Sequence, residues 1–123
     1  MGRGKSKIVH RMSNYKRAVI ARAKLKNYLL NPSKSNGKAA FFKSLGYNMQ
    51  NFRRLEKDIR KGIAETDAVM YIENRYGHNV KVYNINLSLG IDRKAVVLTS
   101  WQVDDGSTIP RFITAFPPNK KKE

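Results

Sequence analysis

The chain has no cysteine among its 123 residues. This absence excludes disulfides, thiolate metal sites, iron–sulfur clusters and a cysteine nucleophile, and it is typical of proteins that work in a reducing compartment. Long apolar runs are also missing, since no stretch reaches the roughly 18 apolar residues that a membrane span needs. The sequence therefore predicts one domain without a membrane span, large enough to bury a core without disulfides or metals.

Acidic residues are scarce, and their scarcity is uneven along the chain. Nine Asp and Glu residues oppose 25 Lys and Arg residues, for a net charge of +16. The first 62 residues hold 17 of the basic residues and only Glu56 and Asp58, whereas the remainder holds eight basic and seven acidic residues. This charge suits a polyanion, and RNA is the first to consider. DNA, an anionic membrane, an acidic protein partner and a merely solvated basic surface stay open as alternatives.

The basic half is predicted to be mainly helical. Residues 18–30 indicate a short strand or helix that runs into a helix, and residues 38–45 predict a short helix with Gly46 as its C-cap. Between residues 52 and 63, apolar residues recur every three or four positions, the spacing of one buried helix face. The other side of that helix carries basic residues that are candidates for binding an RNA backbone: Arg53, Arg54, Lys57, Arg60 and Lys61.

The second half shows the period of two that is typical of strands. Apolar and polar residues alternate over 83–89 and 97–103, which predicts two strands that each bury one face. Asp105-Gly106 is a hairpin signal that leads into a further strand over 109–116, and residues 68–73 add another. The second half is therefore expected to form an antiparallel meander.

These elements predict an α+β domain over residues 14–118, in which N-terminal helices pack on a C-terminal antiparallel sheet of about four strands. Residues 1–13 lack apolar periodicity and are expected to be a flexible basic arm or linker, and residues 119–123 a charged tail. No internal repeat is present.

The chain also lacks the carboxylate and histidine cluster of metal-dependent nucleases and the glycine loop of nucleotide-binding proteins, so no metal and no cofactor is expected. Metal-free RNA cleavage needs only a base, an acid and fixed cations or donors around the phosphate. Each of the residues that could fill these roles also has an ordinary structural explanation as a strand, helix or loop residue. They are His10, His78, Lys24, Lys38, Arg111, Thr99, Ser100, Thr114 and Tyr76.

Trp101 has two interpretations. It lies two residues after Thr99, on the same face of the predicted strand. A tryptophan in a strand is commonly part of the core, but an aromatic ring can also stack on an unpaired base. The pattern leaves both open.

Short motifs follow one another in a fixed order along residues 18–117. They are Lys24-Leu25, Tyr28-Leu29-Leu30-Asn31-Pro32, Gly37-Lys38-Ala39, Phe42, Leu45-Gly46-Tyr47, Tyr76-Gly77, Thr99-Ser100-Trp101 and the run from Pro110 to Pro117. This ordered set resembles an uncharacterised family of C-terminal toxin domains, found at the tips of large bacterial polymorphic toxins.

The resemblance implies a fold similar to the barnase, EndoU, colicin and RelE group of ribonucleases. It also implies a metal-independent endoribonuclease toxin that cleaves RNA, with tRNA as the expected target. Such a domain is secreted or delivered as the C-terminal part of a larger toxin, acts in the cytoplasm of a target bacterium, and is neutralised by a cognate immunity protein. We expect that partner to be acidic and the domain alone to be monomeric.

The residues that match the family's motifs are Lys24, Lys38, Thr99, Trp101, Arg111 and Thr114. The hypothesis assigns Lys38 and Arg111 to the scissile phosphate, Thr99 and Thr114 to positioning or proton transfer, and Lys24 and Trp101 to RNA binding. His78, which matches no motif, is a spare acid or base. The rival hypotheses are a non-catalytic basic nucleic-acid-binding protein, associated with a phage or the ribosome, and a structural or adaptor module.

Overall fold

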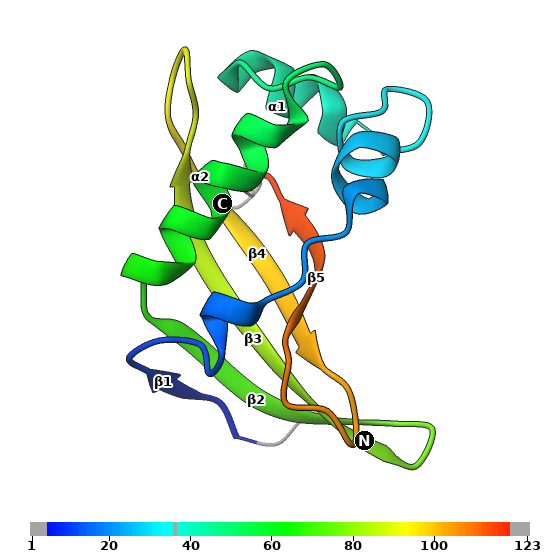
Figure 1. The fold of residues 1–123 in the computed structure, drawn as a ribbon, viewed down its shortest axis with the longest axis vertical. Coiled ribbons are helices and arrows are strands. Elements are labelled where there is room, and N and C mark those ends of the chain that lie inside the picture. The colour runs from blue at the N-terminus through cyan, green and yellow to red at the C-terminus, as the bar shows by residue number, and fades with distance from the viewer. Residues whose placement is uncertain (1–4, 36, 119–123) are drawn as a thin grey trace.

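The computed structural model describes residues 5–35 and 37–118, so the first four residues of the expected arm and the expected tail at 119–123 lie outside the described residues. The dominant element is one sheet in the order β1-β2-β3-β4-β5, in which every neighbouring pair is antiparallel (Figure 1). Its strands are β1 Lys7–Val9, β2 Ala68–Arg75, β3 His78–Leu89, β4 Ala95–Val103 and β5 Arg111–Phe116.

Four helical elements precede β2 in the chain. They are the 3₁₀ turn η1 Tyr15–Arg17, the π-helical segment η2 Ala23–Leu29, and the α-helices α1 Lys38–Leu45 and α2 Phe52–Glu65. The predicted end of α1 is confirmed, because Gly46 adopts φ 106° and its N–H donates to the carbonyl of Lys43 at 2.9 Å. A left-handed residue at this position satisfies carbonyls that the helix leaves free, and glycine adopts it without strain.

The predicted fold class is wrong. The sheet has five strands rather than about four, and strands make up more of the chain than helices do, so the layout is not that of N-terminal helices on a C-terminal sheet in the barnase/EndoU/colicin/RelE manner. The additional strand is β1, which pairs with β2 from Lys7↔Met70 to Val9↔Ala68. A three-residue edge strand is held mainly by backbone hydrogen bonds, and these leave no alternation in the sequence to detect.

Helix α2 covers one face of the sheet by packing on β3. Leu55, Ile59 and Ile63 are at most 1% exposed, as the three- and four-residue spacing predicts. Gly62 permits the close approach, because a Cβ there would lie 2.9 Å from a methyl carbon of Leu87. Figure 1 shows α2 and the segment that contains η1 crossing this same face of the sheet.

Tyr47, between the two α-helices, ties α2 to the turn after β3. Its buried hydroxyl donates to Asp58 Oδ2 at 2.6 Å and accepts from the N–H of Gly90 at 2.9 Å. Burial, with the neighbouring Asp58 carboxylate, raises the pKa of Tyr47, so the phenol keeps its proton. This clamp fixes the segment that follows the C-terminal end of α1.

Candidate active site on the sheet face away from α2

A row of polar side chains crosses the sheet on the face that α2 does not cover. Asn84 of β3 is paired with Ser100 of β4, and Ser100 is paired with Thr114 of β5. Their strand neighbours Ile85 and Ala115 are fully buried in the core, so alternation turns the three polar side chains to the other face. All three are half-buried. We call Asn84, Ser100 and Thr114 the polar row.

Lys38 extends the polar row from the first position of α1. Its Nζ donates to Thr114 Oγ1 at 3.1 Å, although the two residues are 76 apart in the chain. The ammonium also lies 4.4 Å from the centroid of the Phe116 ring and 6.0 Å from that of Tyr28, close enough for attraction to both π faces. Burial lowers the pKa of Lys38 below 10.5. Lys38 and Thr114 therefore form a defined pair with a partly desolvated cation.

The start of α1 is held in place by the loop before it. Gly37 adopts φ 94°, and the buried hydroxyl of Ser35 accepts the N–H of Ala39 at 2.8 Å. An oxygen that accepts a free N–H of the first turn stabilises a helix start. This local geometry directs Lys38 over the edge of β5, toward Thr114.

Thr99 and Trp101 do not belong to the site, which corrects their predicted roles in catalysis and RNA binding. Both are 0% exposed on the α2 side of the sheet. Thr99 Oγ1 donates to the carbonyl of Ile85 at 2.8 Å and accepts from Trp101 Nε1 at 2.9 Å, while the indole packs edge-on against Phe112. Both side chains are fully used by the core, where no substrate can reach them.

Arg111, at the start of β5, lies on the same face as the polar row but is already paired. Its guanidinium donates two hydrogen bonds to Asp104, at 2.9 and 3.2 Å, and this pairing raises the pKa of Arg111. Asp104 also accepts from Gln102, which in turn accepts from Arg75. Gln102 lies two residues beyond Ser100 on β4, a distance of about 7 Å along the strand. The predicted phosphate-binding charge of Arg111 is thus partly offset by its partner.

The Arg111–Asp104 pair makes a pH-dependent prediction. The hydrogen bonds from Arg111 hold the pKa of Asp104 below its ordinary value of 3.8. Because the folded pKa is below the unfolded one, the pair stabilises the fold above about pH 4, and this contribution is lost as the pH falls through the folded pKa. An NMR titration of Asp104 should give a midpoint below 3.8 that moves upward in Arg111→Ala. An unchanged midpoint in the variant would contradict the pairing.

Neither histidine lies near the polar row. His78 begins β3, six residues from Asn84, which corresponds to about 20 Å of extended strand. It is exposed, and its Nδ1 lies 3.2 Å from Asp105 Oδ2. His10 lies next to β1, where it contacts Asp67 at 3.5 Å. The structure therefore separates the predicted spare acid or base, His78, from Lys38 and Thr114.

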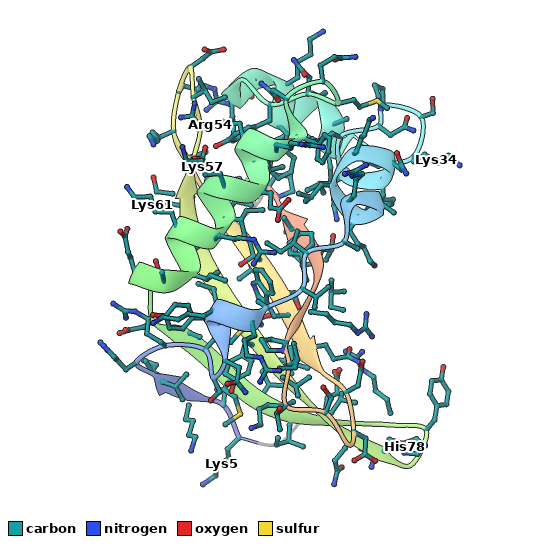
Figure 2. All side chains as sticks on the ribbon, viewed as in Figure 1. Lys5, Lys34, Arg54, Lys57, Lys61 and His78 are labelled. Carbon is teal, nitrogen blue, oxygen red and sulfur yellow. The ribbon has the colours of Figure 1, made fainter. Side chains whose placement is uncertain are left out.

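The basic residues predicted to bind RNA from α2 fall into two groups. Arg54 pairs with Asp58 at 3.1 Å, and Arg60 pairs with Glu56 at 3.0 Å, both one helical turn apart. The others, Arg53, Lys57 and Lys61, are exposed, and Figure 2 shows Lys57 and Lys61 following one another along one side of α2. Lys24 is half-buried on η2. RNA binding by these residues stays a prediction.

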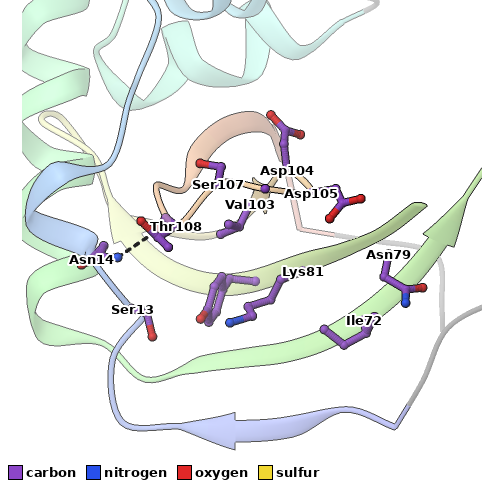
Figure 3. A pocket seen from close by; sticks show the side chains of 12 residues that line it. Ser13, Asn14, Ile72, Asn79, Lys81, Val103, Asp104, Asp105, Ser107 and Thr108 are labelled. Atoms are coloured by element: carbon purple, nitrogen blue, oxygen red, sulfur yellow. Dashed lines mark hydrogen bonds between the residues drawn. The ribbon is translucent and has the colours of Figure 1, made fainter.

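A pocket of about 320 Å³ lies at a different place, between β3 and the loop from β4 to β5 (Figure 3). Its lining includes Lys81, Val103 and Asn14, whose amide donates to the Thr108 carbonyl at 2.7 Å. None of the residues predicted for the site lines it. Tyr83, which lines the pocket, is the strand neighbour of Asn84, so alternation places the pocket on the other face of the sheet from the polar row.

Within residues 5–35 and 37–118, no group of three or more His, Asp or Glu side chains is placed to hold a metal ion. Over the same residues, no helix is long and apolar enough to cross a membrane. The polar row with Lys38 offers a cation, hydroxyls and an amide, which can bind and orient an anion such as a phosphate.

The chain belongs to a family that is described as a domain of unknown function, DUF6883. The family model matches residues 11–119. Searches of curated proteins and of solved structures gave no significant match.

Proposed function

We propose that the protein is a metal-independent endoribonuclease that cleaves RNA across the polar row. The observation that carries this proposal is the contact of Lys38 Nζ with Thr114 Oγ1 at 3.1 Å on the sheet face that α2 leaves uncovered. A partly desolvated lysine next to hydroxyl groups is suited to bind a phosphodiester, because the ammonium stabilises the charge that gathers on the phosphate oxygens during cleavage.

The reaction is an intramolecular transesterification. The RNA 2′-oxygen attacks phosphorus, the bond from phosphorus to the 5′-oxygen breaks, and the products are a 2′,3′-cyclic phosphate and a 5′-hydroxyl. Water accepts the proton that the 2′-OH loses, and the Lys38 ammonium donates one to the leaving 5′-oxygen. Lys38 contacts the phosphate and, with its lowered pKa, gives up a proton to the leaving oxygen more readily than an exposed lysine would.

Hydroxyl groups of the polar row position the phosphate. Thr114 accepts a hydrogen bond from Lys38, and its own proton is free to point at a phosphate oxygen. Ser100 and the amide of Asn84 continue the same row toward the middle of the sheet. Arg111, held by Asp104 along the same face, contributes a cation to a neighbouring phosphate.

The wider biological role follows from the resemblance of the motifs. We propose a toxin domain delivered as the C-terminal part of a larger bacterial protein, with tRNA as its target in the cytoplasm of a recipient cell. A cognate acidic immunity protein would protect the producer. The net charge of +16 favours a partner with the opposite, negative charge.

The purified protein, incubated with total tRNA and rRNA in the presence of EDTA, should produce discrete RNA fragments. Chelation should leave the rate unchanged, since the proposed site uses only side chains of this chain. The variant Lys38→Ala serves as the control for contaminating nucleases. RNA that stays intact at micromolar protein would contradict the proposal and favour a nucleic-acid-binding protein that does not cleave.

A further inference from the structure

Three cations from two helical elements surround a single aromatic ring at the start of α2. Arg22, which precedes η2, Lys26 of η2 and Arg53 of α2 lie 5.5, 5.6 and 5.5 Å from the centroid of Phe52. The ring itself is only 8% exposed, and the three cations cover it. We call Arg22, Lys26 and Arg53 the cation cluster.

No carboxylate among the described residues forms an ion pair with the cation cluster. The two acidic residues of the basic half are engaged elsewhere, Glu56 with Arg60 and Asp58 with Arg54. Because each cation lies within 5.6 Å of one centroid, no two of them can be more than about 11 Å apart. Three like charges at this spacing repel one another, and an anion that binds between them relieves the repulsion.

We propose that the cation cluster binds consecutive phosphates of a nucleic-acid strand, at a surface separate from the polar row. A nucleic-acid strand carries one negative charge on every nucleotide, so a cluster up to about 11 Å wide can contact more than one phosphate of the same strand. Arg53 continues into Lys57 and Lys61, which follow at intervals of four residues and thus at about 6 Å along the helix. The result is a line of exposed cations that begins at the cluster.

The shape of this surface favours a linear polyanion over an acidic protein. Protein interfaces of ordinary size have an apolar core with aromatic residues, whereas Arg53, Lys57 and Lys61 form a narrow exposed ridge of charge. The segment η2 lies between the two sites, since its Lys26 contacts Phe52 and its Tyr28 faces Lys38. A strand that crosses η2 could occupy both. The choice of RNA as the natural ligand rests on the proposed function, but binding by the cluster does not require cleavage.

The test is the affinity of Arg22→Ala/Lys26→Ala for a fluorescent single-stranded oligonucleotide with 2′-deoxy sugars, which lacks the nucleophile and cannot be cleaved. Fluorescence anisotropy at several salt concentrations should show about tenfold weaker binding and a salt slope that is shallower by about 1.4, or about 0.7 for each cation removed. The matched control, Lys5→Ala/Lys7→Ala, removes the same charge from exposed positions on and next to β1. Lys5 lies at the opposite end of the molecule from Arg54 in Figure 2.

Equal losses in the two double variants would overturn the inference, because net charge alone would then explain binding. An unchanged oligonucleotide affinity in Arg22→Ala/Lys26→Ala would overturn it as well. This is the result expected if the cluster binds an acidic protein instead of a nucleic acid. Arg53→Ala, from the other element, should weaken binding in the same way if the cluster acts as a unit. RNA cleavage is measured separately on these variants, so a protein that binds through the cluster but never cleaves refutes only the proposed function.

Discussion

Replacing Lys38 by alanine is expected to lower the rate of RNA cleavage by about 100-fold to 1000-fold, the usual cost of losing one preorganised charge at a transition state. The fold should survive, because Lys38 is half-buried at the first position of α1 and its ammonium contacts one hydroxyl and two ring faces. The measurement is the single-turnover rate on a defined RNA, with circular dichroism as the check on folding. Thr114→Val, which removes only the hydroxyl, should reduce the rate less, by about tenfold to 100-fold.

Lys43→Ala is the matched control for this prediction. Lys43 is exposed on the same helix α1, so the variant loses the same charge from the same element. Lys38→Arg tests the acid role, because arginine keeps the positive charge but does not release a proton near neutral pH. Cleavage in Lys38→Ala at the rate of Lys43→Ala would contradict the proposed site. The wild-type rate should also fall as the pH rises through the lowered pKa of Lys38.

Replacing Trp101 by alanine is expected to destabilise the fold by about 3–5 kcal/mol, the range for a large aromatic side chain removed from a packed core. The indole is 0% exposed, packs edge-on against Phe112 at a centroid distance of 5.3 Å and donates to Thr99. Its removal leaves a cavity and deprives the Thr99 hydroxyl of a donor. Chemical denaturation followed by circular dichroism measures the loss.

Trp101→Phe distinguishes a core role from base stacking. Phenylalanine keeps much of the apolar volume and loses the hydrogen bond to Thr99, so we expect a smaller destabilisation of about 1–3 kcal/mol. Oligonucleotide affinity should equal that of the wild type, because the ring contacts no solvent. Weaker nucleic-acid binding by folded Trp101→Phe would show that the indole reaches the ligand and would contradict its place in the core.

The parts of the fold that the sequence predicted are those with a periodic pattern. The apolar spacing in α2 and the alternation in β3 and β4 come from burial against the same core, and burial selects side chains directly. The strand β1 and the π-helical form of η2 depend on backbone hydrogen bonding, which does not select a side-chain pattern. The sequence pattern therefore could not predict the fifth strand or the fold class that the structure shows.

The candidate site shows the same division. Lys38 and Thr114 were predicted, and the structure brings them together across 76 residues of chain. Of the two neighbouring candidates on β4, the hypothesis gives the catalytic role to Thr99, whereas the structure places Ser100 beside Thr114; a shift of one residue moves a side chain to the other face of a sheet. The register also contains a bulge between Ser100 and Trp101, so that Trp101 is paired with Phe112 and Ser100 with Thr114. The polar positions of β3, among them Asn84, were the available signal for this face.

The sequence shows that basic residues gather in the first half of the chain, but it does not show which of them form ion pairs. Charge balance along the sequence does not show that Arg54 and Arg60 are paired within α2. Nor does it show that Arg22 and Lys26 meet Arg53 over one phenyl ring, because that contact joins two elements separated by α1. Tertiary packing decides which cations stay free for a ligand.

The most direct test of the proposed chemistry is the nature of the RNA ends that the protein leaves. Fragments of tRNA produced in EDTA by the wild type should carry a 2′,3′-cyclic phosphate and a 5′-hydroxyl, and Lys38→Ala should leave the RNA nearly intact under the same conditions. Fragments with a 5′-phosphate and a 3′-hydroxyl, or equal fragmentation by Lys38→Ala, would contradict cleavage by Lys38 and the polar row.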